Sequence, residues 1–168
     1  MILRPTAFME QHVHDFNGKF VLEKGRARLI GSGTKPRNFV AADDVAQFAV
    51  KALLFEPAPG SPIEIGGPGN ASNLDVAHLY SRLTGVDLRL SRMPQAAARA
   101  IGAVLKPFHP GLSRLLSVMA LPDDAFPETF DSTSLQATHP EIQLTTLESF
   151  ARARVASARA GASERSGP

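Results

Sequence analysis

No cysteine occurs among the 168 residues, so neither disulfide bonds nor thiolate chemistry is available to this chain. Long hydrophobic runs are also missing. The most apolar stretch, 96–121, is interrupted by arginine, lysine, histidine and proline, whereas a membrane-spanning helix needs about 20 continuous apolar residues. No secretory signal is visible, because Met1-Ile2-Leu3 leads directly into Arg4-Pro5. We therefore expect a cytoplasmic protein with no membrane partner.

An excess of positive charge is missing from most of the chain. The formal net charge is +2, yet residues 151–168 contribute four arginines against one glutamate, which leaves residues 1–150 at −1. A nucleic-acid surface needs clustered basic residues with interleaved aromatic side chains. The charge distribution therefore argues against nucleic acid as a partner. The length and a hydrophobic content of 43% fit a soluble globular protein with a real core.

Two short β-rich segments, at 1–5 and 62–66, flank the clearest predicted helix. Asp44, followed three residues later by Gln47, has the spacing of a capping box, so we expect Asp44 to cap this helix. Apolar residues then recur at helical spacing as far as residue 55. This order predicts two parallel neighbouring strands joined by a right-handed crossover through the helix at 44–55.

The second half of the chain is predicted to be mainly helical. Ser72 and Asp75 form another capping-box pattern, and Gly85 marks the end of that helix. Beyond residue 156 the composition of Ala, Arg, Ser and Gly is typical of a frayed basic tail. Further elements are predicted at 8–20 (weakly helical), 28–30 and 37–40 (short strands), 86–90 (strand), and in helices from Pro94, from Gly111 and from Thr145, with 120–140 rich in loops.

Four motifs follow one another in a recognisable order: Ile2-Leu3-Arg4-Pro5-Thr6-Ala7-Phe8-Met9-Glu10, then the stretch 31–46, then Ile63-Glu64-Ile65-Gly66-Gly67-Pro68, then Ser72-Asn73-Leu74-Asp75-Val76-Ala77. Together they resemble the carboxy-terminal half of extended and atypical short-chain dehydrogenases, particularly the NmrA-like NAD(P)H-binding group. The resemblance spans roughly residues 1–152. It implies an α/β fold, namely the C-terminal part of a Rossmann-like doubly wound parallel sheet plus a small mixed helical substrate lobe.

The resemblance divides the chain and assigns candidate site residues. It implies a Rossmann-like part with a short-stranded insertion at 1–70, a helical substrate-binding lobe at 71–155 and a flexible basic tail at 156–168. In the family, the L-R-P-T segment passes the nicotinamide end of the cofactor. The candidates are Pro5, Thr6 and Phe8 for cofactor binding, and Met9 and Arg37 for substrate binding.

Two features of the resembled family are absent from the sequence. One is the G-x-x-G-x-x-G turn, whose backbone N–H groups and following helix bind the cofactor pyrophosphate. The other is the Tyr-x-x-x-Lys pair, because Tyr80 is the only tyrosine and Thr84 stands four residues after it. We expect NAD(P)H to belong to the complete protein and this chain alone not to bind it tightly.

Several interpretations of function stay open at this stage. The chain is interpreted as part of an NAD(P)-dependent oxidoreductase-like protein, with no catalytic residue of its own. The alternative is a non-catalytic NAD(P)H-sensing or protein-interaction module. The expected partner is an amino-terminal Rossmann half or a second copy of the chain, and a small-molecule substrate fits the first interpretation.

Each candidate side chain also has a structural interpretation. Arg37 has the pattern of a surface strand arginine as well as that of an anion-binding one, and Phe8 and Met9 suit a core equally well. Glu10 is expected to be a solvated helix residue. His12 and His14 are two residues apart, so on a helix they point to different faces, and we expect exposed histidines without a metal.

Overall fold

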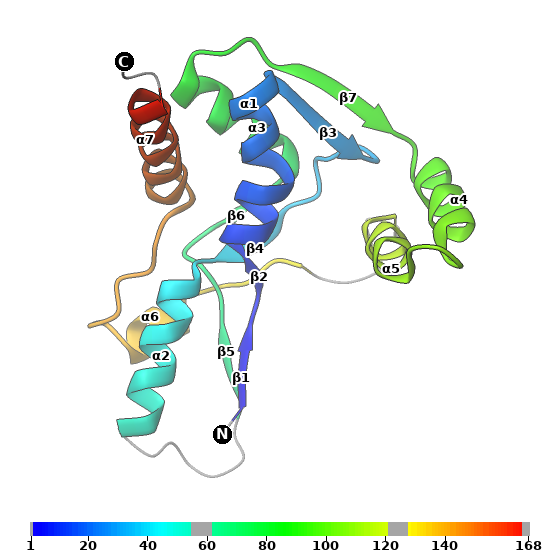
Figure 1. The fold of residues 1–168 in the computed structure, drawn as a ribbon. Coiled ribbons are helices and arrows are strands. Elements are labelled where there is room, and N and C mark those ends of the chain that lie inside the picture. Colours follow the sequence, from blue (N-terminus) through cyan, green and yellow to red (C-terminus); the bar gives the residue numbers. More distant parts are fainter. Residues whose placement is uncertain (1, 55–61, 121–127, 166–168) are drawn as a thin grey trace.

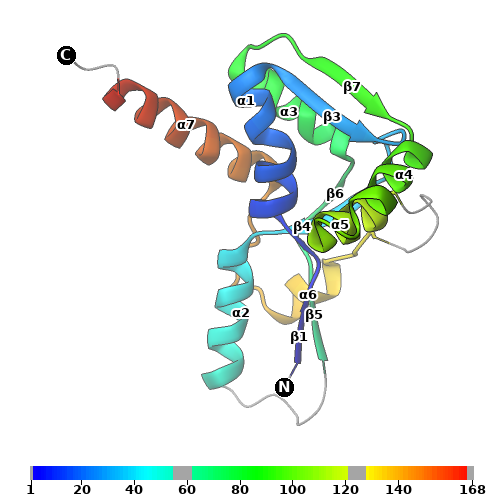
Figure 2. The ribbon, with the colours of Figure 1, turned by 45° about the vertical axis from the view of Figure 1, so that its right-hand side comes forward.

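The structure is a computed structural model that describes residues 2–54, 62–120 and 128–165 (Figure 1). Strand β1 (Ile2–Pro5) pairs in parallel with β5 (Pro62–Ile65), with Leu3 opposite Ile63. Helix α2 (Ala42–Leu54) lies between them in the sequence and runs alongside the pair in Figures 1 and 2. The predicted parallel pairing and the α/β fold class are thereby confirmed.

The other short strands belong to two further sheets. Strands β2 (Ala7–Phe8), β4 (Arg37–Val40) and β6 (Asn70–Ala71) form one sheet with β4 in the centre, parallel to β2 and antiparallel to β6. Strand β3 (Arg26–Ile30) pairs in parallel with β7 (Arg89–Met93) in the other. The strands predicted at 28–30 and 37–40 therefore exist but join different sheets, and the strand predicted at 86–90 lies three residues later.

The weakly helical segment after β2 is a π-helix, η1 (Met9–Gly18), which continues into α1 (Lys19–Lys24). A π-helix brings residues five apart onto one face. Accordingly, the Asn17 side chain donates a hydrogen bond from Nδ2 to the backbone carbonyl of His12, at 2.9 Å. Gly25 ends α1 with a φ of 60°, in the left-handed region that favours glycine.

The main core lies where η1, α3 (Asn73–Thr84) and α7 (Leu147–Arg165) pack together. The predicted capping box of α3 is confirmed: the Ser72 hydroxyl accepts from the Asp75 amide, and the Asp75 carboxylate accepts from the Ser72 amide. Helix α7 continues to Arg165, nine residues beyond residue 156, where the tail was predicted to start. Buried members of this core include Met9, Val13, Val21, Phe39, Val76, Tyr80, Phe150, Ala151 and Val155.

The start of α2 differs from the prediction. The helix begins two residues before Asp44, so Asp44 is not its N-cap. Instead, the buried Asp44 carboxylate accepts hydrogen bonds from the backbone amide and the hydroxyl of Thr145, each at 2.8 Å. Glu10, expected to be solvated, takes the capping role, because its carboxylate accepts from the Ala42 amide at 3.2 Å.

Helices α4 (Gln95–Leu105) and α5 (Pro110–Met119) form a hairpin that stands away from α2 and α7 in both views (Figures 1 and 2). Gly102 is buried where the two helices meet. A short helix that the sequence did not predict, α6 (Thr133–Thr138), supplies Leu135 to a second core cluster beneath β5 and α2. None of the helices among the described residues is long and apolar enough to cross a membrane.

Candidate functional site

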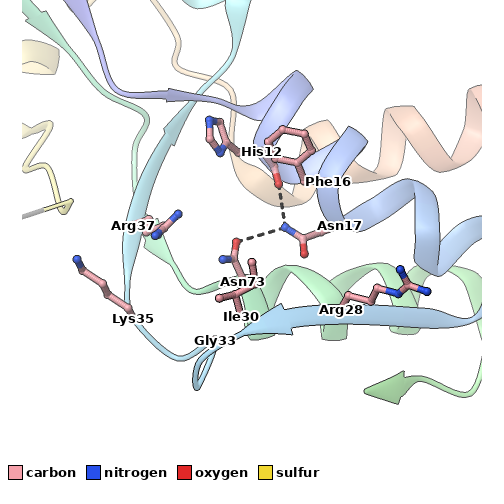
Figure 3. A pocket seen from close by; sticks show the side chains of 9 residues that line it. All are labelled: His12, Phe16, Asn17, Arg28, Ile30, Gly33, Lys35, Arg37 and Asn73. Atoms are coloured by element: carbon pink, nitrogen blue, oxygen red, sulfur yellow. Dashed lines mark hydrogen bonds between the residues drawn. The ribbon is translucent and has the colours of Figure 1, made fainter. Parts of the chain in front are cut away.

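Two cavities share lining residues near the carboxyl end of β1. A hollow of about 40 Å³ lies among η1, β3 and the start of α3, and a larger cavity of about 400 Å³ lies between the end of β1 and α5. His12 and Arg37 line both, so we describe them as one cleft. The hollow is lined by His12, Phe16, Asn17, Arg28, Ile30, Gly33, Lys35, Arg37 and Asn73 (Figure 3), and the larger cavity by Pro5, Thr6, Ala7, His12, Arg37, Asn38, Leu115, Val118, Glu128 and Thr129.

The buried side chain of Asn38 holds the floor of the cleft. Its Oδ1 accepts from the Thr6 hydroxyl at 2.9 Å and from the Gly67 amide at 2.8 Å. Its Nδ2 lies 3.1 Å from the carbonyl oxygens of Gly67 and Gly69. A single amide therefore joins the end of β1, strand β4 and the turn that follows β5, so the position of Thr6 is fixed by the fold.

The turn after β5 requires glycine for a steric reason. A Cβ at Gly67 would lie 2.0 Å from the Phe39 carbonyl oxygen, which belongs to the backbone and cannot rotate away. A Cβ at Gly66 would collide with the Phe130 ring at 2.2 Å. The sequence pattern Gly66-Gly67 thus allows this turn to approach β4 closely enough for Asn38 to bind it.

Three cationic side chains are among the lining residues of the hollow: Arg28 from β3, Lys35 from the following loop and Arg37 from β4. In Figure 3, Arg28 lies on the opposite side from Lys35 and Arg37. Glu128 is the one carboxylate among the described residues that line either cavity. It forms an ion pair with the Arg37 Nε, and its other oxygen lies 3.6 Å from the Lys35 Nζ. Among the described residues that line the two cavities, cationic side chains outnumber carboxylates.

His12 lies at the junction of the two cavities and was not expected to belong to a site. Its ring is half-buried and packs edge-to-face on Phe16, with ring centroids 5.5 Å apart. Burial, and then the positive charge of Arg37, lower the pKa of His12 below its ordinary value, so the neutral imidazole is favoured at pH 7. No signal for this role was present in the sequence, because the helical spacing assumed for residues 8–20 is not the π-helical spacing observed.

The structure brings some of the predicted site residues together and separates others. Pro5, Thr6 and Arg37 line the same cavity. Met9 is buried in the main core and borders a different cavity with Phe39 and Leu147, while Phe8 packs against the second core cluster. Phe8 and Met9 therefore have the surroundings of core residues, and neither lines the cavity that Pro5, Thr6 and Arg37 line.

The only tyrosine is enclosed in the core. The Tyr80 ring lies against Gly18, and its hydroxyl is 3.2 Å from the Nδ1 of His14. Burial raises the pKa of this phenol. His14 is half-buried rather than exposed, and burial lowers its pKa. Among the described residues no group of three His, Asp or Glu side chains is arranged to hold a metal ion.

Comparisons with known proteins indicate the fold but no family. No family model matches the sequence, and no curated protein matches it. Among solved structures, the chain superposes on UDP-glucuronic acid 4-epimerase from Bacillus cereus in complex with UDP-glucuronic acid and NAD, with a TM-score of 0.64 and 22% identity. The match covers 92% of this chain and 43% of that one.

Two further matches have the same character. A nucleoside-diphosphate-sugar epimerase from Staphylococcus aureus gives a TM-score of 0.65 at 16% identity, covering 89% of this chain and 50% of that one. An NADPH-dependent quinone oxidoreductase from Escherichia coli gives 0.66 at 15% identity, covering 87% and 51%. The chain thus has a Rossmann-type fold and spans about half the length of these solved structures or less.

Proposed function

We propose that this chain is the substrate-lobe part of an NAD(P)-dependent oxidoreductase-like protein. The observation that carries the proposal is the cleft at the carboxyl end of β1. In open α/β sheets, ligands bind outside the carboxyl ends of parallel strands. Pro5 and Thr6 occupy that position, and Arg37 faces the same cavity. The solved structures that share the fold include proteins described as NADPH-dependent or bound to NAD.

The residues around the cleft fit one end of such a cofactor. A bound nicotinamide would supply a hydride acceptor or donor. Pro5 and Thr6 would lie beside this ring, with the Thr6 hydroxyl oriented by its hydrogen bond to Asn38. Arg37 would face the substrate. Phe8 packs against the second core cluster, so we assign it a structural role near the site and no contact with the cofactor.

This sequence contains no motif that would bind the pyrophosphate of the cofactor. Neither Gly31-Ser32-Gly33 nor Gly66-Gly67-Pro68-Gly69 leads from a first strand into a helix, which is the geometry that binds a pyrophosphate. Gly66-Gly67 is instead occupied by its contacts with β4 and Asn38. The chain alone is therefore expected to bind NAD(P)H weakly, and the glycine-rich turn is expected from another stretch of polypeptide.

The surface around β1 and α2 supports a partner of this kind. In the described part of the chain β1 pairs only with β5, which leaves its other edge open. Ile2 of β1 and Val50, Leu53 and Leu54 of α2 are exposed, with Leu53 at 79%. An amino-terminal Rossmann half that continues the sheet past β1 would cover part of this surface.

A non-catalytic NAD(P)H sensor is the second candidate. Tyr80 is fully buried and lines neither cavity of the cleft, so a tyrosine that acts as an acid or base there would have to come from the amino-terminal part. The two candidates share the cofactor and differ in turnover.

Cofactor titrations test the proposal. Calorimetry with NADH and NADPH on the chain alone should show no saturable micromolar binding. A fusion that places the amino-terminal Rossmann unit of the Escherichia coli quinone oxidoreductase before Ile2 should bind NADPH. Thr6→Val should weaken that binding, whereas Thr133→Val on α6, away from the cleft, should not.

A fusion that melts cooperatively and fails to bind either cofactor would contradict the proposal. If the fusion does not fold, the same unit added as a separate chain serves as the test, with binding followed by the fluorescence of NADPH. The rate of NADPH oxidation by the fusion in the presence of a panel of quinones and aldehydes would then distinguish an oxidoreductase from a sensor.

A further inference from the structure

The α4–α5 hairpin carries many of its apolar side chains on the outside. Of the twelve large hydrophobic side chains that are exposed in the described part of the chain, five lie within residues 101–118. Ile101 and Val104 share one face of α4, Phe108 follows in the turn that connects the two helices, and Leu112 and Val118 belong to α5. A concentration of exposed apolar side chains indicates an interaction surface.

The hairpin also carries positive charge without nearby negative charge in the sequence. Arg99, Lys106 and Arg114 are exposed, and no Asp or Glu occurs between Asp87 and Asp123. Among the described residues, none of these three cations forms an ion pair. Asp123 lies outside the described residues, and the ten residues of α5, about 15 Å of helix, separate the connecting turn from that end of the hairpin. The charge of the turn therefore suits an anionic partner.

The cations of α7, the other basic part of the chain, have different surroundings. Arg152 pairs with Glu148, and Arg159 donates a hydrogen bond to the Leu83 carbonyl at 3.1 Å. None of the exposed large hydrophobic side chains of the described residues lies on α7. These arginines thus contact acceptors of the chain itself and lie away from an apolar surface.

The connecting turn has no free backbone N–H group over residues 106–110. Two of these five residues are prolines, which carry no N–H. The other three amides donate to carbonyl oxygens of Ala103 and Leu105 in the last turn of α4, at 2.7 to 3.4 Å. An unsatisfied N–H group is costly away from water. The turn can therefore enter a less polar environment without exposing a backbone donor to it.

Shape and charge distinguish the possible partners. Figures 1 and 2 show the hairpin standing away from α2 and α7. A symmetric contact between two copies would bring the cations of two hairpins together, and contacts between like charges are unfavourable. Binding to single-stranded nucleic acid relies on stacking against several aromatic rings, whereas the hairpin offers the one phenyl ring of Phe108. Basic helices with large apolar side chains are typical of the membrane interface, where the apolar groups reach the acyl chains and the cations meet anionic headgroups.

We propose that the α4–α5 hairpin docks on the surface of an anionic phospholipid membrane. Val104, Phe108 and Leu112 reach the boundary of the acyl chains, and Lys106 lies among the headgroup phosphates. The expectation of no membrane partner rested on the missing membrane-spanning run, and a hairpin that lies on a surface needs no such run. Because α5 also lines the larger cavity, docking brings the cleft close to the membrane.

A single tryptophan can report the position of the turn, because the chain contains none of its own. The full chain with Phe108→Trp is mixed with vesicles of phosphatidylcholine alone, or of equal parts of phosphatidylcholine and phosphatidylglycerol. With the anionic vesicles we expect the emission to shift to shorter wavelength and to be quenched by brominated acyl chains. Leu53→Trp, at an equally exposed position of α2, should show neither change.

Flotation of the full chain with the anionic vesicles measures the contribution of each group. Phe108→Ser should weaken binding by about tenfold or more, because the buried ring is lost. Lys106→Gln should weaken it by about fivefold, the contribution of one cation near an anionic surface. Arg82→Gln on α3 and Arg159→Gln on α7 should leave it nearly unchanged. All four positions are exposed, and cooperative melting verifies that each variant is folded.

Several results would overturn the proposal. Equal binding to neutral and anionic vesicles would remove the charged contact, and equal changes for Phe108→Trp and Leu53→Trp would mean unspecific adsorption. A loss from Arg159→Gln as large as that from Lys106→Gln would assign the binding to α7. Tighter binding of a short DNA duplex than of the anionic vesicles would assign the cations to nucleic acid. A dimer in sedimentation that Phe108→Ser abolishes would assign the hairpin to a second copy.

The fusion with the amino-terminal Rossmann unit tests whether the hairpin stays accessible in a longer protein. It should bind the anionic vesicles as tightly as the chain alone. Loss of binding in a fusion that melts cooperatively would show that the added unit covers the hairpin, and the proposal would fail. No step of these measurements involves NAD(P)H, so this inference and the proposed function fail separately.

Discussion

Two regions have similar apolar sequences but differ in how far they bury them. One is the body, formed by η1, α3, α7 and strands β1 and β4, and the other is the α4–α5 hairpin. In the body, Val76 and Tyr80 are fully buried between η1 and α7. In the hairpin, Val104 is 70% exposed and Phe108 is 75% exposed. Among the described elements, α4 and α5 pack extensively only on each other. The body is thus stabilised by many elements, and the hairpin by one mutual contact.

This difference bears on the cleft, because the two regions form different sides of it. Strands β1 and β4 and helix η1 belong to the body; β4 supplies Asn38 and Arg37, and Thr6 directly follows β1. The hairpin supplies Leu115 and Val118. The polar groups are therefore held by a tightly packed framework, whereas the apolar side is formed by an element that can change its sequence without disturbing the core. Such a division suits a site with fixed polar chemistry and a variable apolar ligand.

The largest expected difference in stability is between alanine substitutions at two glycines, one in a close contact within the body and one within the hairpin. Gly67→Ala places a Cβ against the Phe39 carbonyl and should destabilise the chain by roughly 3 kcal/mol or more. Gly102→Ala in the hairpin meets Ser113 O at 3.4 Å, an ordinary contact, and alanine favours a helix. We expect it to stay within about 1 kcal/mol of the wild type. Urea unfolding followed by circular dichroism compares the two, and equal losses would remove the distinction between the regions.

Valine truncation gives the next largest effect. Val76→Ala removes buried methyl groups from the body and should cost about 2 kcal/mol, counting the cavity that is left. Val104→Ala removes the same groups from the exposed hairpin and should change the free energy of unfolding by less than about 0.5 kcal/mol. A large loss from Val104→Ala would show that the hairpin face is covered by other parts of the protein in solution.

Local patterns in the sequence predicted the body's elements well. The Ser72 and Asp75 capping box placed the start of α3, and Gly85 placed its end. The alternation of a strand, a helix and a strand predicted the parallel β1–β5 pair. These features depend on neighbours in the sequence, or on one crossover whose geometry is restricted.

The cleft was predicted only in part, because its remaining contacts join distant segments. Pro5, Thr6 and Arg37 were named by resemblance; they line one cavity, and their roles stay predictions. His12 was not, since the π-helix that turns it toward Arg37 has no pattern in the sequence that differs from a weak α-helix. Asp44 shows the same limit: its partner Thr145 lies 101 residues away, and a local capping pattern was the nearer explanation.

Substitution of Asp44 tests how much a buried polar contact contributes to the stability of the body. Asp44→Ala removes the acceptor for the Thr145 amide and hydroxyl and should cost about 2 kcal/mol, because charge-assisted hydrogen bonds to a buried group are lost. Asp43→Ala, at the exposed neighbouring position, should change the stability by less than about 0.5 kcal/mol. Hydrogen exchange at the first turn of α7 should increase in the first variant only. Similar exchange in both variants would mean that Asp44 does not anchor α7.

The smallest expected effect is a difference in pH dependence: the stability of the first helical turn should depend on pH in α3 of the body and not in the hairpin helices. Hydrogen bonds from the Ser72 hydroxyl and amide lower the pKa of Asp75 below its ordinary value of 3.8. A carboxyl whose pKa is depressed in the folded state stabilises the fold above its unfolded pKa, and this contribution is lost as the pH falls through the folded value. The N-caps of α4 and α5 form no such side-chain bond. Lowering the pH from about 5 to about 3 should therefore weaken protection of the amides in the first turn of α3, by under about 1 kcal/mol at this exposed site, and leave the hairpin unchanged. Asp75→Asn should abolish the pH dependence in α3, and its persistence in that variant would assign the effect to another carboxylate.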